Sequence, residues 1–152
     1  MFNGVTNFSK TIDCRLTHEN LWNLIKQALL NSKNVLCWPN QLESLSADKL
    51  QKGAIVNATY HTPSGEYKFI YTIIDFVPGK LIKYHTSEGH IYDGGATIEI
   101  VKTKTGSQLK WYGRYKHERI SLRVIYLRYY LIPMFFKTLS KGLNSNKVLN
   151  KF

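Results

Sequence analysis

Residues 71–84 have the sequence YTIIDFVPGKLIKY, in which two apolar segments flank the turn-forming triplet Val77-Pro78-Gly79. Short connections that contain Pro or Gly are typical of antiparallel hairpins. Similar connections lie on either side of this stretch, at residues 62–65 (TPSG) and 104–106 (KTG). We therefore expect consecutive strands to be neighbours in one antiparallel sheet.

Apolar and polar residues alternate on both sides of these turns, which is the pattern of strands with one buried face. The sequence predicts six such strands, at residues 41–47, 54–61, 66–76, 81–87, 96–103 and 107–117. An earlier strand is expected from about Phe8 to Leu16, where Ile12 and Cys14 follow the same alternation. The predicted sheet therefore has about seven strands.

Three segments have helical spacing instead. Residues 18–30 place apolar side chains three and four positions apart, and Thr17 before them is a helix-capping residue. A second, brief helix is expected beside Trp38, because Pro39 ends it. Residues 118–144 form a long helical stretch with one internal proline. The predicted order, β-α-α-β6-α, belongs to the α+β class.

The composition is that of an ordinary globular protein, so residues 1–152 are expected to form one domain. A chain of this length buries roughly 70% of its unfolded surface and needs no disulfide or metal to fold. Cys14 and Cys37 lack the spacing of a zinc site and are expected to be free thiols in a reducing compartment. The first residues do not resemble a secretory signal, so a cytoplasmic location is predicted. Neither a metal nor a cofactor is expected.

The net charge of +11 favours anionic partners such as nucleic acid, lipid headgroups or an acidic ligand. Basic residues are spread from Lys10 to Lys151 without a nucleic-acid-binding signature, so specific nucleic-acid binding is not expected. The longest apolar-rich stretch, Val124 to Phe136, is interrupted by Arg128. It is shorter than the roughly 20 apolar residues that cross a bilayer, so no membrane span is predicted. No sequence pattern indicates an oligomeric state.

Several short motifs occur in an order that is informative as a whole. They are Thr17–Ile25 (THENLWNLI), Trp38-Pro39, Gly53 before a strand, residues 71–84, and Gly106 introducing a strand that contains Trp111. Over nearly the whole chain, their order and spacing resemble the START-like superfamily, also called SRPBCC or the birch-pollen-allergen fold. That superfamily includes lipid-transfer domains and polyketide cyclases.

The resemblance implies a helix-grip fold, in which a curved antiparallel sheet wraps around the long C-terminal helix. It also implies a ligand cavity between the sheet and that helix. The expected function is binding, transport or sequestration of a hydrophobic or amphipathic small molecule, such as a lipid or a polyketide. The richness of the last helix in Tyr and Arg departs from the family pattern, so the identity of the ligand does not carry over.

Strand alternation indicates which side chains face this space. Tyr67, Phe69, Tyr71 and Ile73 share one face of their strand, and Leu109, Trp111 and Tyr115 share one face of the last strand. These aromatic residues are either ordinary core or the wall of a cavity. The candidate ligand-binding residues are Arg128, Tyr60, Phe69, Tyr71, Tyr84, Trp111, Tyr115, Val124, Leu127 and Leu131.

Arg128 is the least expected residue of the last helix. At 100° per residue it falls on the apolar side, together with Val124, Leu127, Leu131, Phe135 and Leu139. A buried guanidinium stays charged and needs an anionic or hydrogen-bonding partner. Three interpretations are open: contact with an anionic ligand in the cavity, a salt bridge to a sheet acid such as Glu99 or Asp75, or a rotated helix that brings Arg128 to the rim.

Pro133 cannot donate a backbone hydrogen bond to the carbonyl of Tyr129, so a kink is expected there. The kink either widens the mouth of the cavity or lets the helix follow a curved sheet. Met134-Phe135-Phe136, next to Lys137 and Lys141, leaves peripheral membrane contact open.

The sequence contains no GxSxG, P-loop, HExxH or GxGxxG motif, so no catalytic residue is predicted. The resemblance to polyketide cyclases keeps one alternative, an enzyme that uses pocket Tyr, His or Arg residues as acids and bases. Its candidates are Tyr60, Tyr71, Tyr84, His117 and Arg128. A second alternative is a membrane-surface or protein-interaction module.

Overall fold

The computed structural model describes residues 4–31, 40–62, 65–86, 93–117 and 122–151. They contain one antiparallel sheet in the strand order β1-β7-β6-β5-β4-β3-β2. The strands are β1 (Gly4–Cys14), β2 (Asn40–Leu45), β3 (Ile55–Thr62), β4 (Gly65–Val77), β5 (Leu81–Thr86), β6 (Asp93–Thr103) and β7 (Gly106–His117). The helices are α1 (His18–Asn31), α2 (Leu122–Tyr126), η2 (Leu127–Leu131), α3 (Ile132–Leu143) and α4 (Asn146–Leu149).

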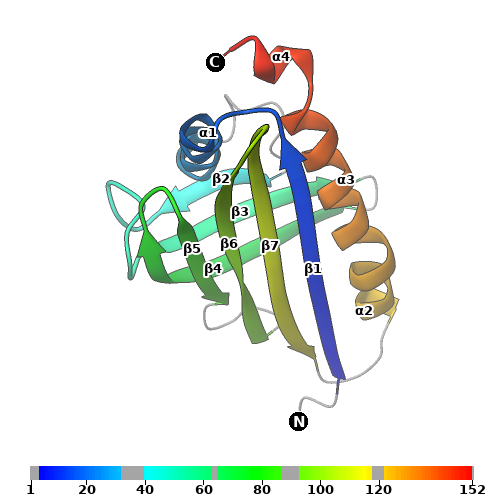
Figure 1. Cartoon of the computed structure of the whole chain (residues 1–152). Coiled ribbons are helices and arrows are strands. Elements are labelled where there is room, and N and C mark those ends of the chain that lie inside the picture. The colour runs from blue at the N-terminus through cyan, green and yellow to red at the C-terminus, as the bar shows by residue number, and fades with distance from the viewer. Residues whose placement is uncertain (1–3, 32–39, 63–64, 87–92, 118–121, 152) are drawn as a thin grey trace.

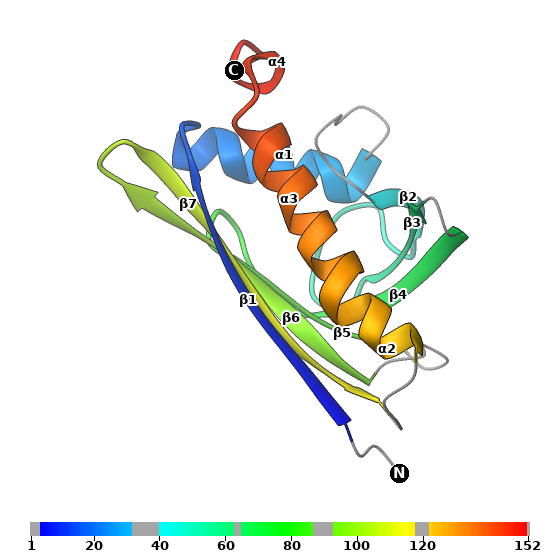
Figure 2. The ribbon, with the colours of Figure 1, turned by 90° about the vertical axis from the view of Figure 1, so that its right-hand side faces the viewer.

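The sheet curves around the C-terminal helical segment, and α1 lies across one end of it (Figures 1 and 2). The α+β class, the seven strands and the helix-grip arrangement that the sequence predicts are all confirmed. The brief helix expected beside Trp38 lies outside the described residues.

Consecutive strands from β2 to β7 are sheet neighbours, as the short turns predict. In the Val77-Pro78-Gly79 turn, the Lys80 N–H donates to the Val77 carbonyl at 3.0 Å. Gly79 has a φ of 74°, which side-chain-bearing residues rarely adopt. The first strand, by contrast, pairs with the last, so that Phe8 lies opposite Gly113.

A β-bulge interrupts the alternation of β4. Its pairing with β5 shifts between Ile73 and Asp75, and beyond the shift Asp75 is exposed while Phe76 is half-buried. An extra residue in one strand bends that strand and reverses which side chains face inward beyond it. Phe76 therefore points toward α1, with its ring centroid 5.7 Å from that of Trp22.

Helix α1 closes one end of the space under the sheet. The Thr17 hydroxyl accepts a hydrogen bond from the Asn20 N–H at 3.2 Å, which confirms the predicted cap. The apolar face of the helix is buried and contains Leu21, Leu24, Ile25, Ala28 and Leu29. These side chains belong to the same buried core cluster as Leu139 and Leu143 of α3.

The C-terminal helical segment changes its winding in the middle. Residues 127–131 form a π-helical turn between α2 and α3, and Pro133 lies in the first turn of α3. A π turn bonds residue i to i+5 rather than i+4. Because Pro133 lacks an N–H, the ordinary i+4 pattern is already broken at this place.

Candidate functional site

A cavity of about 90 Å³, partly open to solvent, lies between the sheet and the C-terminal helical segment. Half of the 16 residues in its wall are aromatic: Phe8, Phe69, Tyr71, Tyr84, Trp111, Tyr115, Phe135 and Phe136. Aliphatic residues make up most of the remainder, with Thr86 the one other polar residue. None of the 16 is an acid, a lysine, an arginine or a histidine, so this wall is apolar and uncharged.

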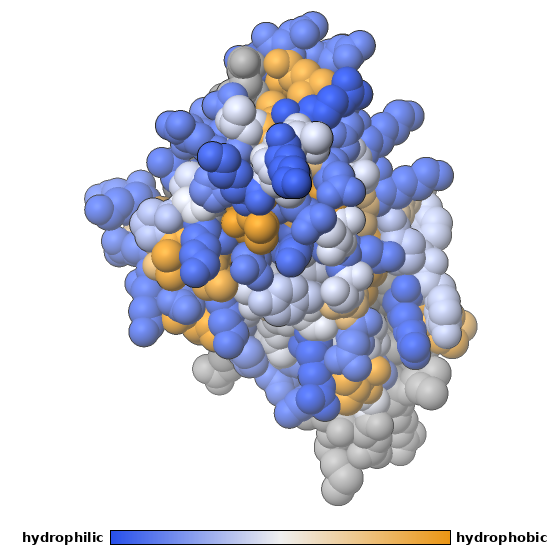
Figure 3. Space-filling model, viewed as in Figure 1, coloured by the Kyte–Doolittle hydropathy of each residue, from blue (hydrophilic) through white to orange (hydrophobic). Residues whose placement is uncertain are grey.

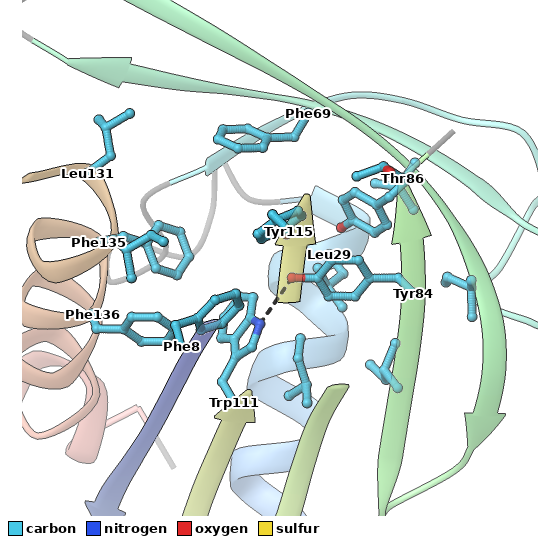
Figure 4. A pocket seen from close by; sticks show the side chains of 16 residues that line it. Phe8, Leu29, Phe69, Tyr84, Thr86, Trp111, Tyr115, Leu131, Phe135 and Phe136 are labelled. Carbon is cyan, nitrogen blue, oxygen red and sulfur yellow. Dashed lines mark hydrogen bonds between the residues drawn. The ribbon is translucent and has the colours of Figure 1, made fainter. Parts of the chain in front are cut away.

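Aromatic rings from the sheet and from α3 hold the two walls together. The Trp111 ring meets those of Phe135 and Phe136 edge to face, with centroids 5.2 and 5.4 Å away. Phe8 stacks on Tyr115 at 5.8 Å. Edge-to-face and offset-stacked pairs are the favoured geometries of aromatic rings. Figure 4 shows these rings projecting from the sheet and the helix toward one another.

A short hydrogen-bond chain crosses the floor of the cavity. The Trp111 Nε1–H donates to the Tyr84 hydroxyl oxygen at 3.0 Å (Figure 4). The Tyr84 hydroxyl in turn donates to the hydroxyl of Tyr115. Because β6 separates β5 from β7, these bonds join strands that are not neighbours.

Tyr71 lies beside this chain and is not joined to it by any hydrogen bond that the structure records. Its ring centroid is 4.5 Å from that of Tyr84, and its side chain is half-buried because it faces the cavity. A tyrosine hydroxyl removed from bulk water needs a partner. Water or a guest molecule in the cavity is in the position to supply one.

Burial keeps the three tyrosines in the protonated form. It raises the pKa of Tyr115 to about 12, and the hydrogen bond from Tyr84 only partly offsets this. Burial also raises the pKa of Tyr71 and of Tyr84 well above 10, with a further contribution from the neighbouring Tyr115. At neutral pH these hydroxyls donate and accept hydrogen bonds but do not act as bases.

Six of the ten predicted site residues lie in the cavity wall, although their contact with a ligand stays a prediction. They are Phe69, Tyr71, Tyr84, Trp111, Tyr115 and Leu131. The side chains of three others, Tyr60, Val124 and Leu127, lie outside the part of the chain whose side chains the structure describes.

The tenth residue, Arg128, is not part of the cavity wall. Its side chain is exposed, and its guanidinium carbon lies 5.5 Å from the centroid of the Tyr129 ring. The expectation that Arg128 points into the cavity is therefore wrong, and the rim interpretation fits the structure. The physical reason is the π turn at residues 127–131, which adds a residue to the turn and breaks the uniform 100° spacing.

Sequence reasoning missed several wall residues. Phe8 has the same parity as Ile12 in β1, but its contact with the cavity depends on the pairing of β1 with β7. Phe135 and Phe136 were expected either on the apolar side of the helix or against a membrane. Both line the cavity, and Phe136 is 6% exposed, so Phe136 faces the interior; membrane contact through this segment stays a prediction.

The histidines that the structure describes lie away from this wall. His117, an acid–base candidate, is buried, and its Nε2 lies 3.2 Å from the hydroxyl oxygen of Thr6. His85 lies in β5, and its Nε2 is 3.6 Å from Asp93 Oδ1. Within the described ranges, no group of three or more His, Cys, Asp or Glu side chains has the arrangement of a metal site. Cys14 is buried, and its Sγ donates to the Ile12 carbonyl oxygen at 3.6 Å.

Among the helices that the structure describes, none has the length and apolar character needed to cross a membrane.

Comparison with known proteins supports the fold. No family model matches the sequence, and neither does any curated protein. Solved structures match at probability 1.00. The allergen Ara h 8.0201 aligns with a TM-score of 0.65 and 12% identity, covering 97% of this chain and 99% of the other. Norcoclaurine synthase from Thalictrum flavum gives 0.67 and 14%, with coverages of 98% and 88%.

A third structure shows the same fold inside a larger chain. The di-domain ARO/CYC StfQ from the steffimycin biosynthetic pathway aligns with a TM-score of 0.67 and 13% identity. The alignment covers 97% of this chain and 50% of StfQ. At these identities the similarity establishes the helix-grip fold alone. The function has to be argued from the cavity.

Proposed function

We propose that this protein, as one domain over residues 1–152, binds a neutral hydrophobic or amphipathic small molecule in the cavity and carries or sequesters it. Lipids and polyketides are the expected classes. The observation that supports this is an aromatic cavity lined by Tyr71 in which none of the described wall residues is charged. Apolar pockets with a few placed polar groups are typical of small-molecule sites.

The wall favours a neutral guest. A charged group taken into an apolar cavity without a partner costs several kcal/mol, on the order of a thousandfold or more in affinity. Arg128, for which contact with an anionic ligand was one of three interpretations, is exposed at the surface. A carbonyl or hydroxyl is a better match, because the protonated Tyr71 can donate to it and the Thr86 hydroxyl is also in the wall.

The size of the cavity limits what enters without movement. An engineered apolar cavity of about 150 Å³ takes a benzene molecule. At about 90 Å³, the present cavity takes one ring of a guest, and because it is partly open the rest of the guest extends outside. A larger guest extends through the mouth or displaces side chains of the helix wall such as Leu131 and Phe135.

Fluorescence of the neutral dye N-phenyl-1-naphthylamine tests the proposal. We expect saturable binding, with energy transfer from the protein's tryptophans. The anionic dye 1-anilinonaphthalene-8-sulfonate should bind at least tenfold more weakly, because its sulfonate lacks a charged partner in the wall. If the neutral dye does not bind, or if the anionic dye binds as well, the proposal is wrong.

A matched pair of variants locates the dye. Leu131→Trp places a large ring in the cavity wall, whereas Leu122→Trp makes the same change at an exposed position of the same helical segment. Binding should be lost in Leu131→Trp and kept in Leu122→Trp. Native mass spectrometry of the purified protein then reports whether a hydrophobic molecule is carried from the cell.

The enzymatic alternative is a cyclase-like reaction in the same cavity. Two of the structures with this fold are named as a synthase and as an ARO/CYC protein. The cavity tyrosines, held protonated, favour polarising a carbonyl over removing a proton. The 16 wall residues include no general base, so binding is better supported than catalysis.

The proposed location of the protein is the cytoplasm.

A further inference from the structure

The helix that forms one wall of the cavity also presents an exposed apolar face. Leu122 and Tyr129 are 85% and 70% exposed, and Ile125 and Tyr130 are 44% and 41% exposed. Together with the exposed Arg128, these residues define the α2 face. Apolar side chains normally lie singly on a surface, whereas an exposed apolar cluster marks an interaction site.

The spacing of these residues places them together. Leu122 and Ile125 lie three positions apart in α2, which is the spacing of one helix face, and Tyr129 follows in the π turn, where its side chain is 70% exposed. In Figure 3, apolar surface projects at the lower right edge of the molecule, over the region of α2 in Figure 1. These exposed side chains do not pack against the core. The cavity is covered by Leu131, Phe135 and Phe136, which lie on the other side of the segment.

The charge of the segment indicates the kind of partner. Residues 122–149 contain five basic residues, Arg123, Arg128, Lys137, Lys141 and Lys147, and no acidic residue. The described acids at this end of the sheet, Glu66 and Asp93, belong to β4 and β6. The positive charge of this segment and the net charge of +11 of the whole chain therefore both favour an anionic partner.

The residue types narrow the partner further. Tyrosine rings with an apolar body and a polar tip are enriched at the boundary between headgroups and acyl chains. Tyr126 and Tyr130 stack with their centroids 4.7 Å apart, and Arg128 lies over Tyr129. Leu and Ile insert below that level, while Arg and Lys attract anionic headgroups. The α2 face combines all three kinds of side chain.

We propose that the α2 face docks the protein on the surface of a bilayer that contains anionic phospholipids. Leu122, Ile125 and Tyr129 enter the interface, and Arg128 meets the headgroups. Because Leu131 of the adjoining η2 turn lines the cavity, docking brings the wall of the cavity next to the bilayer. An apolar guest then passes between membrane and cavity with little exposure to water.

Co-sedimentation of the full chain with vesicles tests this surface. We expect binding to phosphatidylcholine vesicles that contain phosphatidylglycerol, and much weaker binding to phosphatidylcholine alone or at high salt. Leu122→Ser combined with Tyr129→Ser should reduce the partition coefficient at least tenfold. Arg128→Gln should reduce it about fivefold, since each basic residue near an anionic surface contributes about 1 kcal/mol.

The matched control removes similar side chains elsewhere. Ile55→Thr combined with Tyr112→Thr changes residues that are 45% and 41% exposed on strands, and it should leave vesicle binding unchanged. The proposal is wrong if the wild-type protein does not bind anionic vesicles. It is also wrong if the variants of the α2 face bind these vesicles as well as the wild type does. A protein partner captured by the α2 face in place of vesicles also overturns it.

Dye binding separates the two proposals. The α2 face variants should keep wild-type affinity for N-phenyl-1-naphthylamine and the wild-type circular dichroism spectrum, because the changed side chains lie outside the cavity wall. Loss of vesicle binding with dye binding intact supports docking. Vesicle binding without dye binding would leave the docking surface standing and remove the cavity function.

Discussion

The two ends of the space under the sheet are built differently. At the α1 end, Leu21, Ile25, Leu139 and Leu143 are fully buried and close-packed. At the α2 end, large rings surround a hollow, and Tyr115 lines it. Branched aliphatic side chains interdigitate and fill space. Flat rings that are held by edge contacts and hydroxyl hydrogen bonds cannot move together to fill the hollow. The same sheet and the same helical segment therefore form a packed core at one end and a cavity at the other.

The largest change in the free energy of unfolding is expected when a leucine is shortened to alanine, and the two ends should differ in the size of that change. Leu139→Ala removes a side chain with 0% exposure and is expected to lower the free energy of unfolding by about 3–5 kcal/mol. Leu131→Ala, on the cavity wall, is expected to lower it by about 2 kcal/mol. Leu131 already faces a void on one side and has fewer contacts to lose.

Urea denaturation measures both values, and dye binding adds an independent check. Leu131→Ala enlarges the cavity and should keep or improve affinity for N-phenyl-1-naphthylamine. Equal losses of stability in the two variants would mean that the α2 end is packed as tightly as the α1 end, which would contradict the comparison.

Gly113 of β7 keeps the cavity end open, and adding one methyl group there tests this. A Cβ at Gly113 would lie 2.5 Å from the Gly95 carbonyl oxygen and 2.8 Å from the Phe8 ring. Gly113→Ala should therefore push Phe8 toward the hollow, lower stability by about 2 kcal/mol and weaken dye binding.

Gly53→Ala is the control for this variant. Nothing lies within 4 Å of a Cβ at Gly53, but its φ of 89° is unfavourable for alanine. Its expected cost is about 1 kcal/mol from the backbone alone, with dye binding unchanged. Unchanged dye binding in Gly113→Ala would mean that Phe8 does not shape the cavity.

The sequence predicts the sheet side of the cavity well, because strand parity is a local property. Alternation alone assigned Phe69 and Tyr71 to the inner face of β4, and Trp111 and Tyr115 to that of β7. The alternation changes after Ile73, so that Phe76 rather than Asp75 faces inward, and its cause is local as well, the β-bulge.

The helical wall of the cavity was predicted less well, because a π turn cannot be recognised from a pattern that assumes 3.6 residues per turn. Arg128 was placed on the wrong side for this reason. The role of Phe8 and the hydrogen bond from Trp111 to Tyr84 were also out of reach. Both depend on strands that meet only in the folded sheet, since Phe8 lies opposite Gly113 and Trp111 is 27 residues from Tyr84.

A smaller effect distinguishes the two neighbouring tyrosines at the cavity end. Tyr84→Phe removes the acceptor of the Trp111 N–H and should cost about 1–2 kcal/mol, because a buried donor loses its partner. Tyr71→Phe removes a hydroxyl without a recorded hydrogen bond and should cost less than 0.5 kcal/mol, about the limit for changes that break no contact. The affinity for a guest that bears a carbonyl should show the opposite order, with Tyr71→Phe weakening binding more than Tyr84→Phe does. Equal costs in denaturation would show that the hydrogen-bond chain does not stabilise the wall.

The smallest predicted effect is a pH dependence confined to alkaline solution. Tyr115 has a pKa of about 12 in the folded protein because it is buried, against about 10 when unfolded. Its contribution to stability is therefore intact below pH 10 and is lost as pH rises toward 12, since the unfolded chain releases the proton first. Between pH 10 and 11, Tyr115→Phe should lose about 1 kcal/mol less stability than wild type. Urea denaturation at the two pH values measures this difference, with Tyr112→Phe as the exposed control. Equal losses in wild type and Tyr115→Phe would mean that the Tyr115 hydroxyl is in contact with bulk water and that the α2 end is more open than its aromatic wall indicates.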